Sequence, residues 1–384
     1  MYKYLFLLFY AMFIVGCSTT KQDSIKTHPY PSAISKENKD IQKGILEKKS
    51  EKLKENDIFS IEKGEFIKTE ESVLGYSGKK EKIAIIFASK VVGKYGSDTI
   101  NSVVSYLMQK NIDFDLRVYD SIYENQNSVQ KSFDEASQEG FKNIIAVLAY
   151  EQSLSYISNL NFFDNIYIPT LHKKNSFVHS NNIIYGAISY EEQYDKLFRF
   201  ANSYKLVEIY DTDKISNLFL NYISLKGKKL NKRYQIVKSQ TNFKSLFQNN
   251  SLLNDSTIFL NSTVLQSAIV MSQLRVYEIY PDSILATQLS YNPMILTLSQ
   301  YQDRKKMFIA SSIGDSTSNL VAIGSVLGAD IRYNWVNFST LIGLNKIIFN
   351  NQDSEISGYK IIDNQVIYNI SLYRAGEFSF IKID

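Results

Sequence analysis

The sequence has a single cysteine, Cys17, among its 384 residues, and one cysteine can form no disulfide within the chain. Histidine is almost as scarce, with His28, His172 and His179 as its three occurrences. None of the three stands at the close Cys, His, Asp or Glu spacing that zinc sites require. These shortages exclude a disulfide framework and predict that the protein holds no metal and no other cofactor.

Signatures of catalysis and of nucleotide binding are missing as well. Gly93 and Gly96 follow an apolar segment, but they match neither of the glycine-rich phosphate-binding fingerprints. No Gly-x-Ser-x-Gly nucleophile motif occurs in the sequence. The net charge of +4 lacks the clustered basic residues of a nucleic-acid footprint. The sequence therefore predicts a protein that is not an enzyme and does not bind nucleic acid.

Apolar and aromatic residues are plentiful by contrast. Hydrophobic residues make up 44% of the chain and aromatic residues 13%, with 27 tyrosines and 23 phenylalanines. This composition can build a sizeable core and is typical of a folded rather than a disordered protein. Because 384 residues exceed what one core usually supports, we expect two lobes and a linker.

Residues 1–16 have the organisation of a secretory signal peptide. Lys3 is followed by the apolar run Leu5–Val15, which is too short to span a bilayer comfortably. The tetrad Ile14-Val15-Gly16-Cys17 resembles the lipobox of bacterial lipoproteins, in which the cysteine becomes the lipidated first residue. A signal anchor, or a cleaved signal with an incidental cysteine, is the alternative.

The resemblance implies a lipid anchor, such as a palmitate-containing one, on Cys17. Ser18, which follows the cysteine, favours the outer membrane facing the periplasm over retention in the inner membrane. Residues 17–80 are polar and charged, and they contain two prolines and a lysine-rich run. This composition is typical of a tether that holds a folded part away from the membrane.

From residue 81 onward, apolar strands alternate with amphipathic helices. Ile83–Ala88 is a continuous apolar run of the kind found in strands buried on both faces. The pattern predicts helices at Thr99–Lys110, with Ser97 or Asp98 as the N-cap, and at Glu151–Asn159. Further strands are expected at residues 114–119, 143–148, 166–168 and 183–185.

The alternation of strands and helices begins again near Lys205, with predicted strands at 206–210, 233–237, 257–260 and 283–287. Helices are expected at 213–225, 242–248, 264–277 and 335–349. We therefore predict an α/β fold with two doubly wound parallel-sheet lobes and C-terminal β-hairpins around Asp363-Asn364 and Ala375-Gly376. The first lobe would cover about 81–200 plus C-terminal segments, and the second about 201–285.

The order and spacing of these elements resemble the first lobe of type I periplasmic binding proteins, a family that includes receptors for leucine, isoleucine and valine. The shared pattern includes Lys94-Tyr95-Gly96 at a helix start, Leu116–Ser121 at a strand end and Asn143–Val147 as the third strand. The segment Leu285–Tyr291 is similar to one in the LppC-like lipoproteins, which carry this fold and activate penicillin-binding proteins.

The resemblance implies a binding site between the lobes, in the loops that follow the carboxyl ends of the strands. Amino-acid receptors of the family have small hydroxyl residues after the third strand, whereas this chain has Tyr150-Glu151-Gln152. Glu151 would repel the carboxylate of an amino acid. Trp335 begins an apolar helix and is expected to pack in the core rather than to stack on a ligand. The candidate residues for a ligand or partner cleft are Ser89, Tyr95, Tyr150, Gln152, Ser153, His172, Lys173 and Asn261.

Three functions remain open at this point. The first is a noncatalytic envelope lipoprotein that binds another envelope protein and regulates peptidoglycan synthesis. The second is a lipid-anchored solute receptor of an ABC transporter, and the third is a structural envelope component. The tether and the altered loop at Tyr150 favour the first. The expected partners are the membrane, through the lipid, and either an envelope protein or a small solute.

Overall fold

The computed structural model describes residues 80–201, 204–211, 213–237 and 241–384. These residues all belong to one compact unit. The expectations for the signal peptide, for lipidation of Cys17 and for the tether fall outside the described residues.

Seven strands form the first sheet, in the order β11-β12-β5-β4-β3-β1-β2. Five of its pairings are parallel, and β11 joins β12 as an antiparallel hairpin. Asp363 and Asn364, both with positive φ, form the two-residue turn of that hairpin. The strands are β1 (Glu81–Phe87), β2 (Phe114–Asp120), β3 (Asn143–Val147), β4 (Asn165–Ile168), β5 (Ile183–Tyr185), β11 (Tyr359–Ile362) and β12 (Gln365–Tyr368).

The second sheet also has seven strands, in the order β14-β13-β10-β9-β8-β6-β7, and its five parallel strands repeat the arrangement of β5-β4-β3-β1-β2 in the first sheet. Its strands are β6 (Leu206–Tyr210), β7 (Lys232–Gln235), β8 (Thr257–Asn261), β9 (Ser283–Ala286), β10 (Met307–Ser311), β13 (Ser371–Ala375) and β14 (Phe380–Lys382). The sheet thus continues beyond residue 285, where the second lobe was predicted to end. Composition could not reveal this, because β13 reaches β10 by an antiparallel pairing between segments far apart in the chain. The predicted α/β fold, with two mostly parallel sheets and C-terminal hairpins, is confirmed.

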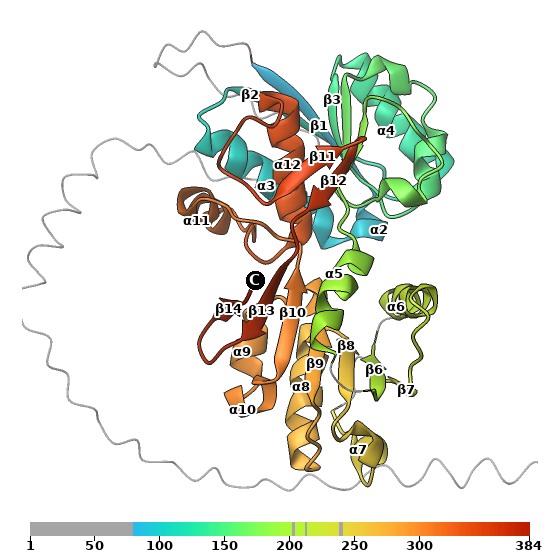
Figure 1. The fold of residues 1–384 in the computed structure, drawn as a ribbon. Helices are drawn as coiled ribbons and strands as arrows, with labels where there is room; N and C mark the ends of the chain where they lie inside the picture. Colours follow the sequence, from blue (N-terminus) through green and yellow to red (C-terminus); the bar gives the residue numbers. More distant parts are fainter. Residues whose placement is uncertain (1–79, 202–203, 212, 238–240) are drawn as a thin grey trace, which may run out of the picture. The chain divides into compact units, whose positions relative to one another are not determined.

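Helices cover both faces of the first sheet, as the continuous apolar strands require. Ile83 and Ile85 of β1 belong to one buried cluster, and the alternate residues Ala84 and Ile86 belong to another. Figure 1 shows α3 and α12 on one side of these strands and α4 on the other. The helices of this lobe are α2 (Ser89–Val92), α3 (Lys94–Gln109), α4 (Gln126–Gln138), α11 (Ser318–Val326) and α12 (Trp335–Phe349).

The second lobe is arranged in the same way. Leu206 of β6 faces the cluster that contains α6, and Val207 faces the cluster that contains α8. Its helices are α5 (Tyr190–Leu197), α6 (Asp213–Leu225), α7 (Lys244–Phe247), α8 (Val264–Val276), α9 (Met294–Leu298) and α10 (Tyr301–Arg304). Short 3-10 helices complete the fold: η1 (Glu151–Tyr156), η2 (Leu160–Phe162), η3 (Lys173–Asn175), η4 (Phe198–Phe200), η5 (Ser251–Leu253) and η6 (Gln288–Ser290).

Three local expectations were wrong. The helix expected at Glu151–Asn159 is the short 3-10 helix η1, and the helix expected at 242–248 contains only the four residues of α7. The long helix α3 begins at Lys94 instead of Thr99, because Gly93, at φ +54°, ends α2 and lets a new helix start directly. Ser97 and Asp98 therefore lie inside α3 and do not cap it.

The chain passes between the two sheets three times, through residues 186–189, 312–317 and 369–370. The third passage carries β12 of the first sheet into β13 of the second (Figure 1). Gln193 of α5, which is fully buried, bonds two neighbouring segments: its Nε2 donates to Ser312 Oγ (2.8 Å), and its Oε1 accepts from the Gln288 amide (2.8 Å).

Candidate functional site

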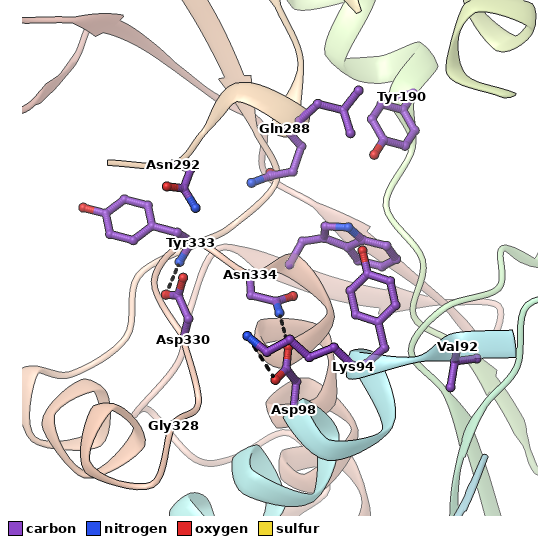
Figure 2. A pocket seen from close by; sticks show the side chains of 13 residues that line it. Val92, Lys94, Asp98, Tyr190, Gln288, Asn292, Gly328, Asp330, Tyr333 and Asn334 are labelled. Atoms are coloured by element: carbon purple, nitrogen blue, oxygen red, sulfur yellow. Dashed lines mark hydrogen bonds and ion pairs between the residues drawn. The ribbon is translucent and has the colours of Figure 1, made fainter. Parts of the chain in front are cut away.

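A cavity of about 470 Å³ lies where the two lobes meet. The first lobe contributes α2, the start of α3 and the segment before α12, and the second lobe contributes the segment after β9 (Figure 2). Because β1 and β9 both end beside the cavity, it occupies the position in which ligands of parallel sheets bind. Its size falls in the range of small-molecule sites.

Asp98 lies at the base of this cavity, buried to 5% exposure on α3. Its Oδ2 accepts a bond from Asn334 Nδ2 (3.1 Å), and Lys94 Nζ lies 3.8 Å from its Oδ1. Asn334 also caps α12, since its Oδ1 accepts from the Val336 amide at 3.0 Å. Burial raises the pKa of Asp98; Lys94 opposes this rise, and the nearby carboxylate of Asp330 adds to it.

Aromatic side chains form much of the remaining wall. Tyr95 is 42% exposed, and burial, followed by the charge of Asp98, raises the pKa of its hydroxyl. Tyr190, Tyr333 and Trp335 complete the aromatic lining. Trp335 packs against the core, as predicted, and it also lines the cavity. The core packing of this side chain does not remove it from the wall of the cavity.

Gln288 faces the cavity from the second lobe, and the orientation of its amide is fixed. Its Oε1 accepts from the Ser312 backbone amide (2.8 Å) and from Ser311 Oγ (3.1 Å). The other end, Nε2, is buried and has no hydrogen-bond partner among the described residues. Figure 2 shows the side chain extending toward the space between Asn292 and Asn334. This leaves an unpaired donor at the wall of the cavity.

The predicted residues after β3 lie outside this cavity. Tyr150 and Gln152 are exposed, and Ser153 is fully buried. The carboxylate of Glu124 occupies the donors of this turn: it accepts from the backbone amides of Ala149 (2.8 Å) and Tyr150 (2.9 Å) and from Ser153 Oγ (2.7 Å). The chain thus places one of its own carboxylates where the family resemblance implies that a ligand carboxylate would bind.

Replacing Glu124 with alanine should lower the free energy of unfolding by about 2 kcal/mol, because hydrogen bonds to a charged acceptor would be lost. Acetate at high concentration should restore part of this loss in Glu124→Ala and none in the parent, since it can re-enter the vacated turn. Chemical denaturation with and without acetate measures both effects. Equal responses of the two proteins to acetate would contradict this account of the turn.

Ser89 and Asn261, also predicted for the cleft, form hydrogen bonds within their own lobes instead. The Ser89 amide donates to Asp120 Oδ1 (3.0 Å) at the start of α2. Asn261 is 1% exposed, and its Nδ2 donates to Glu208 Oε1 (2.8 Å) inside the second lobe. Neither residue lines the cavity, and of the eight predicted residues Tyr95 alone does so.

His172 and Lys173 line a different hollow of about 570 Å³, beside the β11–β12 hairpin. Lys173 Nζ donates to the Asp363 carbonyl (2.6 Å), which ties η3 to the turn of that hairpin. Burial, and secondarily Lys174, lowers the pKa of His172 to about 4. Its Nδ1 accepts from the Lys174 amide (3.2 Å), so this histidine is a neutral structural cap at physiological pH.

Nothing in the sequence indicated that Asp98, Gln288, Asp330 and Asn334 line a site. Asp98 was interpreted as a helix cap, and the side-chain partner of Asn334 is Asp98, far away in sequence. The side chain of Gln288 is oriented by Ser311 and Ser312. Asp330 bonds to the nearby Tyr333 amide. Within the part of the chain that the structure describes, no group of three or more His, Cys, Asp or Glu side chains could hold a metal ion. No described helix is long and apolar enough to cross a membrane.

The fold is that of the type I periplasmic binding proteins. A putative branched-chain amino acid ABC transporter protein from Rhodospirillum rubrum superposes with a TM-score of 0.58 at 11% identity, over 79% of this chain and 100% of that one. The leucine binding protein LivK from Thermotoga maritima gives a TM-score of 0.50 at 14% identity, over 79% and 98% of the two chains.

The same fold occurs in LpoA from Haemophilus influenzae. The C-domain of LpoA, described as a regulator of PBP1A, matches with a TM-score of 0.51 at 16% identity, over 79% of this chain and 100% of the domain. Against a longer LpoA structure the TM-score is 0.54 at 14% identity, and the match covers 80% of this chain and 59% of LpoA. No family model and no curated protein matches the sequence.

Proposed function

We propose that this chain is a noncatalytic envelope lipoprotein, anchored by lipid on Cys17, whose binding-protein-like module binds another envelope protein. The partner we expect is a penicillin-binding protein, so that the module regulates peptidoglycan synthesis. The location we expect is the outer membrane, facing the periplasm. The similarity to the C-domain of LpoA supports a binding role, and the lipobox-like tetrad before Ser18 supports the anchor.

The observation that carries this proposal is the Glu124 carboxylate in the turn after β3. In an amino-acid receptor of this fold, the family resemblance implies that the donors of this turn receive the ligand. Here the Ala149 and Tyr150 amides and Ser153 Oγ all bond to Glu124. A second carboxylate would have to displace the first and would meet its charge. This arrangement disfavours an amino-acid receptor and so favours a protein partner.

A solute receptor that feeds an ABC transporter is the second candidate function. The observation in its favour is the cavity of about 470 Å³ between the lobes, which could enclose a small molecule. Such a receptor would use the cavity beside Asp98 instead of the turn after β3.

The test is affinity purification of the native lipoprotein after crosslinking in cells, with mass spectrometry of both proteins and small molecules. We expect a penicillin-binding protein to be enriched and the purified chain to stimulate glycan polymerisation by that protein. A Cys17→Ala chain, which cannot be lipidated, is the control and should lose the enrichment. Recovery of a tightly held metabolite, with no synthase and no stimulation, would instead identify a receptor.

A further inference from the structure

Two carboxylates and four aromatic rings surround the cavity between the lobes. Asp98 is buried and Asp330 is exposed, with Asp330 Oδ1 accepting from the Tyr333 amide (2.9 Å). Lys94, whose side chain is 83% exposed, is the one cation among the residues that line the cavity. The lining therefore carries a net negative charge.

The protein compensates the buried carboxylate of Asp98 incompletely. Burial raises its pKa and the nearby Asp330 adds to the rise, while Lys94 and the bond from Asn334 only partly offset it. Lys94 stands 3.8 Å away on an exposed and flexible side chain, so it can leave at little cost. A second cation between the carboxylates would relieve their repulsion.

The aromatic rings favour one kind of cation. Tyr95, Tyr190, Tyr333 and Trp335 all line the cavity. The negative face of an aromatic ring attracts ammonium and guanidinium groups. A hydrated inorganic cation gains little from such a wall. The combination is therefore suited to an organic cation.

The unpaired donor of Gln288 adds a second requirement for a ligand of this cavity, which is a hydrogen-bond acceptor. Its Oε1 is held by the Ser312 amide at 2.8 Å, so Nε2 cannot exchange places with it. A buried donor without an acceptor is unfavourable, and a ligand that supplies an oxygen would remove this cost. Figure 2 shows Gln288 on the opposite side of the cavity from Asp98 and Asp330.

We propose that the cavity binds an organic ammonium or guanidinium group that carries a nearby hydrogen-bond acceptor, with Asp98 and Asp330 facing the cation and Gln288 Nε2 donating to the acceptor. A lysine or arginine side chain, followed by a peptide carbonyl, has this chemistry. So does a small amine that also carries an acceptor oxygen. This inference rests on the proposed function, because it assigns the first of these ligands to the protein partner.

The test is calorimetry on the full chain in detergent with the peptide acetyl-Gly-Arg-Gly-amide. The matched probe replaces arginine with citrulline, which keeps the shape and loses the charge. We expect the citrulline peptide to bind at least about tenfold more weakly, a difference of about 1.4 kcal/mol. Argininamide, a free guanidinium compound with a carbonyl acceptor, is titrated alongside: tighter binding of the peptide indicates a protein side chain, and tighter binding of argininamide indicates a small solute.

Two variants of lining residues and one control variant locate the binding. Asp330→Asn keeps the acceptor for the Tyr333 amide. It should lower the affinity for the arginine peptide about tenfold and leave the affinity for the citrulline peptide unchanged. Asp164→Asn makes the same charge change outside the cavity and should have no effect. Gln288→Glu keeps the bond to Ser312 but removes the donor, so binding of the peptide should fall relative to binding of tetramethylammonium, which has no acceptor.

Equal binding of the arginine and citrulline peptides, or no binding of any cationic probe, would overturn the inference. It would also be overturned if Asp330→Asn changed nothing while thermal melting showed an intact fold. The proposed function would survive these results if a synthase were still captured from cells. Conversely, binding of argininamide without any captured synthase would keep the cation site and remove the proposed partner.

Discussion

Replacing Arg233 with alanine should lower the free energy of unfolding by about 3–5 kcal/mol, because it leaves a buried carboxylate without its charge partner. Glu208 of β6 is fully buried, and its Oε2 accepts from Arg233 Nε at 2.8 Å. Its Oε1 accepts from Ser216 Oγ (2.7 Å) and Asn261 Nδ2 (2.8 Å). These neutral donors would remain in Arg233→Ala, but they carry no compensating charge.

Urea denaturation measures the loss, and the neighbouring residue offers a matched control. Lys232 is exposed on the same strand, so Lys232→Ala should change stability by less than about 0.5 kcal/mol. The double variant Arg233→Ala with Glu208→Gln should recover a large part of the loss, since it removes the unpaired charge. A loss in Arg233→Ala no greater than that in Lys232→Ala would show that the ion pair contributes nothing to the second lobe.

The second large effect concerns Gly343 in the middle of α12. A Cβ at this position would lie 2.4 Å from Cδ1 of Tyr167, a fully buried side chain of β4. Helix propensity alone predicts that Gly343→Ala stabilises the protein by about 1 kcal/mol. Overpacking against a ring that cannot move away costs about 3 kcal/mol, so we expect a net loss of about 2 kcal/mol.

The sign of the change in stability of Gly343→Ala shows whether helix propensity or overpacking dominates. Tyr167 is held in place because its hydroxyl shares a hydrogen bond with Ser339 Oγ (2.9 Å), one turn earlier in α12. A double-mutant cycle with Tyr167→Val should show that alanine at position 343 becomes tolerated once the ring is removed. Thermal melts of the four proteins provide the measurement. If Gly343→Ala raised the melting temperature, the close packing of α12 on the first sheet would be refuted.

The sequence predicted most of the strands because their signal is local. Ile83–Ala88 is uniformly apolar, and the structure buries these residues on both faces of a sheet. The hairpin at Asp363-Asn364 was also predictable, since those residue types tolerate the positive φ of its turn. The parallel orientation of strands that are joined through helices was predictable from the alternation of strands and helices. The antiparallel pairing of β13 with β10 was not.

Most residues of the site could not be predicted from the sequence, because their contacts are with residues far away in the chain. Asn261 follows a strand end, as a cleft residue would, but its amide bonds to Glu208 on the neighbouring strand. Ser153 was chosen for its hydroxyl, and that hydroxyl bonds to Glu124, 29 residues earlier in the chain. Asp98 was interpreted as a helix cap, but α3 begins directly after Gly93, so Asp98 lies inside the helix. A single sequence gives no signal for any of these pairings.

The placement of the last strands has a consequence for biosynthesis. The segment from Tyr359 to Lys382 provides the outer strands of both sheets: β12 lies beside β5, and β13 lies beside β10. While the chain is still being made, β5 and β10 are therefore open edges, which are prone to pair with other chains. The first sheet is incomplete until Tyr368 has been made, and the second sheet is incomplete until Lys382 has been made. A chaperone that shields nascent edges would therefore protect both halves of this protein at once, and early release would leave both incomplete.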